Sequence, residues 1–100
     1  MSEAQKGAWF DEALAIRDAL ADAMARGTAA EDTALDALLK RHHAWATQTS
    51  GGPLDAQDYI ALGRLNVSNP EFRAMYNAAR PGLAEWMAEA MTAYATRAMN

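Results

Sequence analysis

Pairs of carboxylates four residues apart are the first residues in this sequence whose type and spacing could carry chemistry. The pairs are Asp18 with Asp22, Asp32 with Asp36, and Glu85 with Glu89. Two acids on one helical face could cleave a glycosidic bond if a cleft enclosed them and burial raised one pKa. Each pair falls on or beside the polar side of its predicted helix, where acids are normally solvated. The serines have no G-x-S-x-G context and no triad partners in order. We therefore predict a protein that is not an enzyme.

His42 and His43 are the residues that could bind a metal or a cofactor. Adjacent side chains on a helix diverge by about 100°, so the two cannot ligate one metal ion together. Neither has a second ligand four residues away, as an H-x-x-x-H pair would. We expect His42 to be a structural residue on the apolar face of its helix, with no metal site and no cofactor. A haem ligated by His42 is an alternative.

The composition narrows the class of protein further. The sequence has no cysteine, which excludes disulfides and a thiol nucleophile and is compatible with a cytoplasmic protein. The net charge of -4 argues against nucleic-acid binding by this segment itself, because such binding needs a clustered positive face. No apolar run approaches the length of a membrane span, so we expect no membrane partner. The oligomeric state is left open.

The elements that must position these residues are predicted to be helical throughout. Roughly a quarter of the residues are alanine, Val, Ile and Thr are scarce, and no segment shows the alternation of a half-buried strand. One hundred residues suffice for one core. We therefore predict an all-α fold and a single domain over residues 1–100.

Capping and breaking residues divide the chain into about five helices. Gly27 is expected to end the first helix in a left-handed conformation, and Pro81 and Gly82 to break the chain before the last one. Gly63, inside a helix, indicates close packing or a bend. The first helix is expected over residues 8–26, and the second from the Thr28–Glu31 capping box to residue 46. The third is expected from Asp55 to about residue 66. The fourth is expected from Asn69-Pro70 to the break, and the last over residues 81–98.

The first helix has an apolar arc of about 160°, which is broader than one neighbouring helix usually covers. Arg17 lies near the middle of this arc. Its stem could lie along the core while its head reaches solvent or a carboxylate. Alternatively, part of the helix faces a cavity, where Arg17 could meet an anionic or carbonyl-bearing ligand. The many aromatic and methionine residues beside alanine fit either an ordinary core or a cavity lined by aromatic side chains.

A set of residues spread over nearly the whole chain resembles the TipAS antibiotic-recognition domain. The set comprises Gly27, His42-x-x-Trp45, Leu62-Gly63-x-Leu65-x-Val67-x-Asn69-Pro70-x-Phe72, Tyr76, Pro81-Gly82-Leu83-Ala84, Ala90 and Tyr94-Ala95. That family forms the effector end of MerR-type transcription activators and also occurs as free-standing drug-binding proteins. The resemblance implies a globin-like arrangement of about five helices around a ligand cleft, and binding of bulky peptide-like or heteroaromatic antibiotics.

The sequence departs from the family pattern at three points. The family commonly has an aromatic residue where this chain has Asn66, and usually aspartate where it has Asn69. Members that trap thiopeptides covalently use a cysteine, which is absent here. Binding is therefore expected to be reversible.

The resemblance and the apolar pattern together predict a reversible small-molecule binding site. The predicted ligand-binding residues are Trp9, Phe10, Arg17, Trp45, Tyr59, Met75, Trp86 and Met91, and the predicted structural residues are Gly27, His42, Gly63, Phe72, Tyr76, Pro81 and Gly82. The partner would be an antibiotic-like molecule, with DNA contacted only through a separate N-terminal domain. The alternative is a helical protein–protein interaction or dimerisation domain that uses the apolar arc of the first helix.

Overall fold

The computed structural model describes residues 2–99, so Met1 and Asn100, the ends of the predicted domain, lie outside the described residues. The helices are α1 (Glu3–Ala25), the short 3-10 helix η1 (Thr33–Leu35), α2 (Asp36–Thr47), α3 (Ala56–Ser68), α4 (Pro70–Ala79) and α5 (Leu83–Ala98). No strand occurs within residues 2–99. The prediction of an all-α fold with about five helices is confirmed.

The start of α1 was predicted five residues too late. Ser2 and Gln5 form a capping box, in which the Ser2 hydroxyl accepts from the Gln5 N–H and the Gln5 side chain accepts from the Ser2 N–H. This box starts the helix at Glu3 rather than at residue 8. The helix ends at Ala25, one residue before the predicted end, and Gly27 follows in the left-handed region with a φ of 83°, as predicted.

The predicted capping box of Thr28 and Glu31 was wrong. The Thr28 N–H donates to the Ala23 carbonyl and so closes the end of α1. The next cap is Asp32, whose side chain accepts from the Ala34 N–H at the start of η1. The second α-helix therefore begins at Asp36, several residues later than expected.

The caps around α3 and α4 follow the sequence pattern. Asp55 begins α3 in a capping box with Asp58, and the helix continues two residues beyond the predicted end, to Ser68. The Asn69 side chain then accepts from two backbone N–H groups at the start of α4, with Pro70 in the first helical position.

Pro81 and Gly82 form the tight turn into α5. The Leu83 N–H donates to the Arg80 carbonyl at 3.1 Å, and Gly82 has a φ of 84°. Proline followed by a residue with positive φ is the pattern of a type II turn. The helix therefore begins at Leu83, after the glycine, and not at Pro81.

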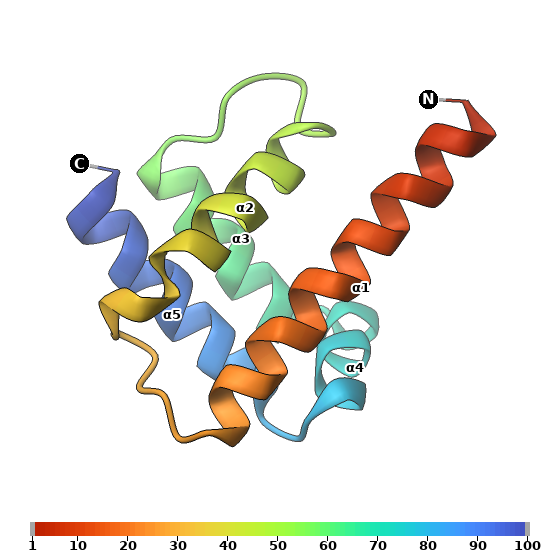
Figure 1. Cartoon of the computed structure of the whole chain (residues 1–100). Coiled ribbons are helices and arrows are strands. Elements are labelled where there is room, and N and C mark those ends of the chain that lie inside the picture. Colours follow the sequence, from red (N-terminus) through yellow and green to blue (C-terminus); the bar gives the residue numbers. More distant parts are fainter. Residues whose placement is uncertain (1, 100) are drawn as a thin grey trace.

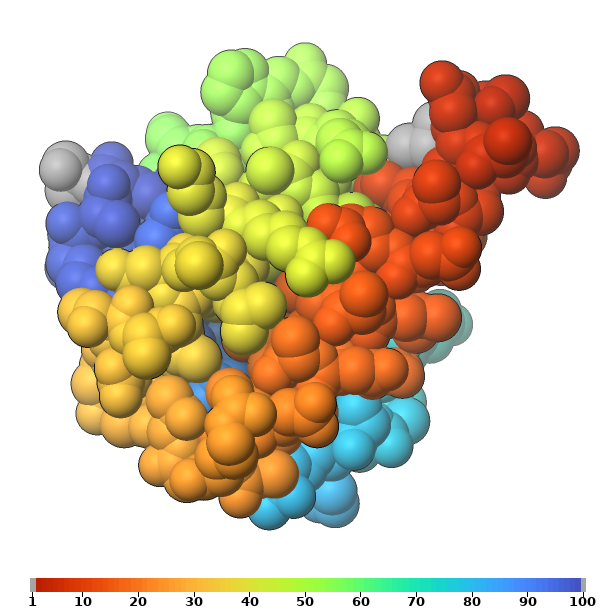
Figure 2. All heavy atoms as spheres, in the orientation of Figure 1, coloured from red at the N-terminus to blue at the C-terminus, as the bar shows by residue number. Residues whose placement is uncertain are grey.

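The core lies along α5, and α3 packs against it over most of its length. Gly63 of α3 permits a close approach to α5, because a Cβ at that position would lie 3.3 Å from the Cα of Ala88. Close packing at Gly63, one of the two predicted outcomes, is therefore what the structure shows. Figure 1 shows α1 crossing the other helices, and Figure 2 shows its N-terminal turns standing out from the body of the domain. None of the helices in the described part of the chain combines the length and apolar character that crossing a bilayer needs.

Candidate ligand-binding site

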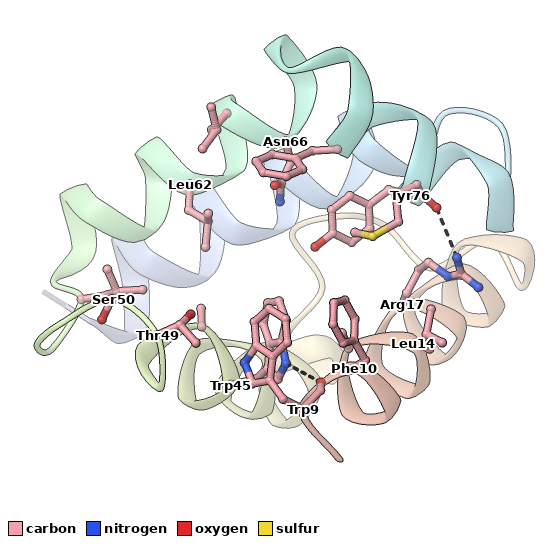
Figure 3. A pocket seen from close by; sticks show the side chains of 16 residues that line it. Trp9, Phe10, Leu14, Arg17, Trp45, Thr49, Ser50, Leu62, Asn66 and Tyr76 are labelled. Carbon is pink, nitrogen blue, oxygen red and sulfur yellow. Dashed lines mark hydrogen bonds between the residues drawn. The ribbon is translucent and has the colours of Figure 1, made fainter. Parts of the chain in front are cut away.

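A pocket of about 520 Å³ lies between α1 and α2 on one side and α3 and α4 on the other (Figure 3). Its volume falls within the range of small-molecule sites, roughly 300–1,000 Å³. The residues after α2, including Thr49, Ser50 and Leu54, close one end. The lining consists of Trp9, Phe10, Ala13, Leu14, Arg17, Trp45, Ala46, Thr49, Ser50, Leu54, Leu62, Leu65, Asn66, Phe72, Met75 and Tyr76.

The broad apolar arc of α1 divides between the core and this pocket. Ile16 and Leu20 lie on the core side and are fully buried. Phe10, Leu14 and Arg17 occupy the pocket side, at the i, i+4 and i+7 positions of one helical face. Phe10 is 58% exposed and Leu14 is 42% exposed, so this face of the helix is not covered by another helix. Arg17 combines the two predictions, because it lines the pocket and its head also pairs with the Asp18 carboxylate at 3.0 Å.

Stacked aromatic rings connect α1 to α2 at the floor of the pocket. The rings of Trp9 and Trp45 are 4.6 Å apart and nearly parallel, and the Trp45 Nε1–H donates to the Trp9 carbonyl at 2.9 Å. Phe10 meets Trp9 edge to face at 5.1 Å. On the outer side, Arg41 donates to Glu12 at 2.7 Å, and this interaction lowers the pKa of the Glu12 carboxyl. The flat indole surfaces therefore have a fixed orientation.

The opposite wall comes from two short stripes with helical spacing. Leu62, Leu65 and Asn66 project from α3, at i, i+3 and i+4. The stripe on α4 has the same spacing and consists of Phe72, Met75 and Tyr76. Leu65, Phe72 and Met75 are each more than a third exposed, so apolar surface is available to a ligand on this side too.

A few polar groups interrupt the apolar lining. Arg17 donates to the Met75 carbonyl at 3.3 Å and to Asp18 at 3.0 Å, which links α1 to α4 at one end of the pocket. The Asn66 side chain is buried in the wall. Burial raises the pKa of the Tyr76 hydroxyl, while the Arg17 charge and the Asn66 amide oppose part of this rise. An apolar cavity with a few convergent polar groups is typical of ligand sites.

Five of the predicted ligand-binding residues line the pocket and three do not. Those in the lining are Trp9, Phe10, Arg17, Trp45 and Met75. The positions predicted for the other three need correction. Met91 and Tyr59 are fully buried in the core between helices, and the Tyr59 hydroxyl bonds to His42. Trp86 lies against the α1–η1 connection, where its Nε1–H donates to the Thr28 carbonyl at 3.2 Å.

The structural residues also need one correction. Phe72, predicted to anchor the core, is 40% exposed and lines the pocket. Tyr76 does both, since it is buried and also lines the pocket. The physical reason is that α4 is short and contacts the core through one narrow stripe, so its remaining large side chains face the cavity.

His42 lies in the core, as predicted. Its Nδ1 is 2.7 Å from the Tyr59 hydroxyl, and its ring stacks beneath Trp45 at 5.6 Å. Burial, and secondarily the neighbouring His43, lowers its pKa to about 4. The residue does not line the pocket, which leaves the haem alternative without geometric support. Within residues 2–99, no three His, Asp or Glu side chains are grouped as metal ligands would be.

The pocket residues that the prediction missed carried a sequence signal. Leu14 extends the stripe of Phe10 along the first helix, and Leu62, Leu65 and Asn66 form a second stripe on α3. Each stripe could have been interpreted as a second apolar face of its helix, in addition to the face that packs in the core. Thr49, Ser50 and Leu54 had no such signal, because they are brought to the pocket only by the path of the loop.

Comparison with known proteins identifies the family of this chain. Residues 1–94 match the model of the TipAS antibiotic-recognition domain. The chain is also similar to the HTH-type transcriptional regulator SkgA from two strains of Caulobacter vibrioides, with 38% identity over 85 residues. This alignment covers 85% of the chain but only 33% of the relative. No solved structure matches the chain significantly. The chain belongs to the TipAS antibiotic-recognition domain family.

Proposed function

We propose that residues 1–100 form a single domain that reversibly binds bulky aromatic or peptide-like small molecules in the pocket between α1, α2, α3 and α4. The observation that carries this proposal is the pocket itself, which is about 520 Å³ in volume and lined by large apolar side chains. Phe10, Leu14 and Phe72 are each at least 40% exposed. A ligand that covered this surface would gain about 25 cal/mol for each Å² of apolar area removed from water.

The domain would act as the effector-sensing part of a transcription regulator of MerR type. Two observations support this role: the family match, and the similarity to a relative named as an HTH-type transcriptional regulator. Because the chain spans 33% of that relative's length, DNA binding would belong to another part of a longer protein. Such a regulator would work in the cytoplasm. A free-standing drug-sequestering protein would use the same pocket.

A ligand between the two walls would act by differential binding to conformations of the domain. The pocket-side face of α1 contacts α4 through the Arg17–Met75 hydrogen bond and contacts α2 through the Trp9–Trp45 stack. A ligand seated between these contacts would favour the arrangement in which both walls are closed around it. The N-terminal turns of α1, which stand out from the body, would transmit the change (Figure 2).

The test is a titration of tryptophan fluorescence in a Trp86→Phe variant. Trp86 lies outside the pocket, so its removal leaves Trp9 and Trp45, which both line the pocket, as the reporters. Thiopeptides and polycyclic aromatic antibiotics form the panel. We expect saturable quenching with at least one class, and loss of the response in Phe10→Ala. No saturable response across the panel, measured also by amide NMR shifts, would overturn the proposal.

A second candidate is a protein–protein contact through α1. Its support is the exposure of Phe10 and Leu14 near the projecting N-terminal turns of that helix. Light scattering separates the two functions. A dimer that depends on protein concentration and is abolished by Phe10→Glu, with no ligand response, would favour the interaction domain.

A further inference from the structure

Two hydrogen-bond donors in the pocket walls have no partner among residues 2–99. They are the amide Nδ2 of Asn66 and the indole Nε1 of Trp9, and both atoms are shielded from solvent. Asn66 is only 5% exposed as a residue, and its side chain reaches from α3 toward the cavity, while Trp9 lies on the opposite wall (Figure 3). A buried donor without an acceptor is unfavourable, so each of these two groups would be stabilised by an acceptor that a ligand brought within reach.

The neighbouring side chains do not supply an acceptor to either donor. The Asn66 amide lies close enough to the Tyr76 hydroxyl to oppose the rise in the pKa of that hydroxyl, yet its Nδ2 has no hydrogen-bond partner among residues 2–99. The other two tryptophans differ from Trp9 in this respect. Trp45 donates its Nε1–H to the Trp9 carbonyl at 2.9 Å, and Trp86 donates to the Thr28 carbonyl at 3.2 Å. Among residues 2–99, Trp9 is thus the tryptophan whose indole N–H has no acceptor, and it lines the pocket.

The buried polar atoms of the pocket that lack a partner are therefore both donors. Arg17, at one end of the same cavity, can only donate as well. A small rotation of either side chain would bring its donor to the cavity surface. A ligand that brings acceptors would then pair groups that are already dehydrated, so it would gain hydrogen bonds without first removing water from the donors. A hydrocarbon of the same shape would leave both donors unpaired, which is the situation in which sites discriminate most strongly.

We propose that Asn66 and Trp9 make this pocket selective for flat polycyclic ligands that carry hydrogen-bond acceptors, such as ring carbonyl groups, over hydrocarbon analogues of the same shape. The flatness follows from the parallel Trp9 and Trp45 rings, 4.6 Å apart, which present an indole face to the cavity. The inference rests on the proposed function, because it concerns ligands of the same pocket.

The test compares two soluble probes of one shape, anthraquinone-2-sulfonate and anthracene-2-sulfonate. The first has carbonyl groups on opposite edges of the ring system and the second has none. Isothermal titration calorimetry measures both dissociation constants, and their ratio cancels the shared ring and sulfonate contributions. We expect the wild type to prefer the quinone about tenfold, as one or two net hydrogen bonds would give. Asn66→Leu and Trp9→Phe should each reduce this preference to about threefold, and the double variant should abolish it.

Trp45→Phe is the matched control for Trp9→Phe. It also removes an indole N–H from the pocket lining, but that N–H is already paired with the Trp9 carbonyl. Affinity for both probes should fall in this variant while the ratio stays at the wild-type value. Circular dichroism checks that each variant is folded; if the double variant is not, Trp9→Phe decides alone, because Trp9 is only partly buried.

The outcomes distinguish a failure of this inference from a failure of the proposed function. An unchanged ratio in folded Asn66→Leu and Trp9→Phe variants, or a wild type that binds both probes equally, would overturn the inference and leave the pocket as a binding site. Failure of both probes and of the antibiotic panel to bind the wild type would overturn the proposed function and the inference together.

Discussion

The two faces of α3 show how this small domain separates stability from a surface open to ligands. One face, with Tyr59 and Gly63, packs on α5 and is completely buried. The other, with Leu62 and Leu65, lines the pocket and is partly open to solvent. Both faces are apolar and both have helical spacing. The difference is that α5 covers the first face, whereas no helix covers the second.

Two methionines show the same contrast more sharply. Met91 of α5 is fully buried between helices, and Met75 of α4 is 37% exposed in the pocket wall. Methionine is flexible and fills irregular space in either setting. Its contribution to folding depends on the number of contacts that the fold provides, so the same residue type should serve stability in one region and ligand contact in the other.

The largest predicted effect tests this methionine pair. Met91→Ala should lower the free energy of unfolding by about 3 kcal/mol, because it removes a fully buried side chain and leaves a cavity. Met75→Ala should lower it by only about 0.5 kcal/mol, as for an exposed position, while weakening ligand binding. Urea unfolding and the fluorescence titration measure the two quantities. Equal losses of stability in the two variants would contradict the proposed difference between the buried methionine and the pocket-lining methionine.

A second prediction concerns the close contact between α3 and α5 at Gly63. Gly63→Val should lower the free energy of unfolding by roughly 2 to 3 kcal/mol, because its Cβ alone would lie 3.3 Å from the backbone of Ala88. Gly7→Val is the matched control, since a Cβ at Gly7 would meet nothing within 4 Å. Thermal unfolding followed by circular dichroism measures both. If Gly63→Val were as stable as Gly7→Val, the tight α3–α5 contact would not be a major source of stability.

The third prediction concerns His42, at the border between the packed core and the aromatic floor of the pocket. Burial lowers its pKa from 6.5 to about 4, so between these values the unfolded chain binds a proton that the folded chain does not. Its contribution to stability is complete above pH 6.5 and is lost as the pH falls toward 4. From pH 7 to pH 5 the free energy of unfolding should fall by about 2 kcal/mol.

His42→Phe provides the control for this pH dependence. The variant lacks the titrating group, so the difference in stability between pH 7 and pH 5 should be smaller by that amount. Urea unfolding at the two pH values gives the comparison. A wild-type difference no larger than that of the variant would show that burial of His42 does not oppose its protonation.

The local features of the fold were predictable because their causes are local. Gly27, Asn69-Pro70 and Pro81-Gly82 act through backbone conformations and caps that depend on a few neighbouring residues. The Thr28–Glu31 box failed for the opposite reason. The same residues could either cap a new helix or close the end of α1, and the second use prevailed in the folded chain.

The candidate site was predictable only in part. Trp9, Phe10 and Arg17 could be selected because the apolar arc of the first helix is too broad for one neighbour. Trp86 and Met91 were placed in the site because a large apolar residue has the same pattern whether it faces a core or a cavity. Asn66 was noticed only as a departure from the family pattern, and its burial without a partner could not be foreseen.

The sequence by itself determined the helical class, most of the caps and turns, and the broad apolar arc on α1, because propensity and spacing act over a few residues. Tertiary structure decided which apolar stripe is covered and which is left open. That decision depends on the Gly63–Ala88 contact, which draws α3 onto α5 and leaves the opposite face of α3 toward α1. A pocket is the space that packing does not fill, so it becomes defined only when all the helices are in place.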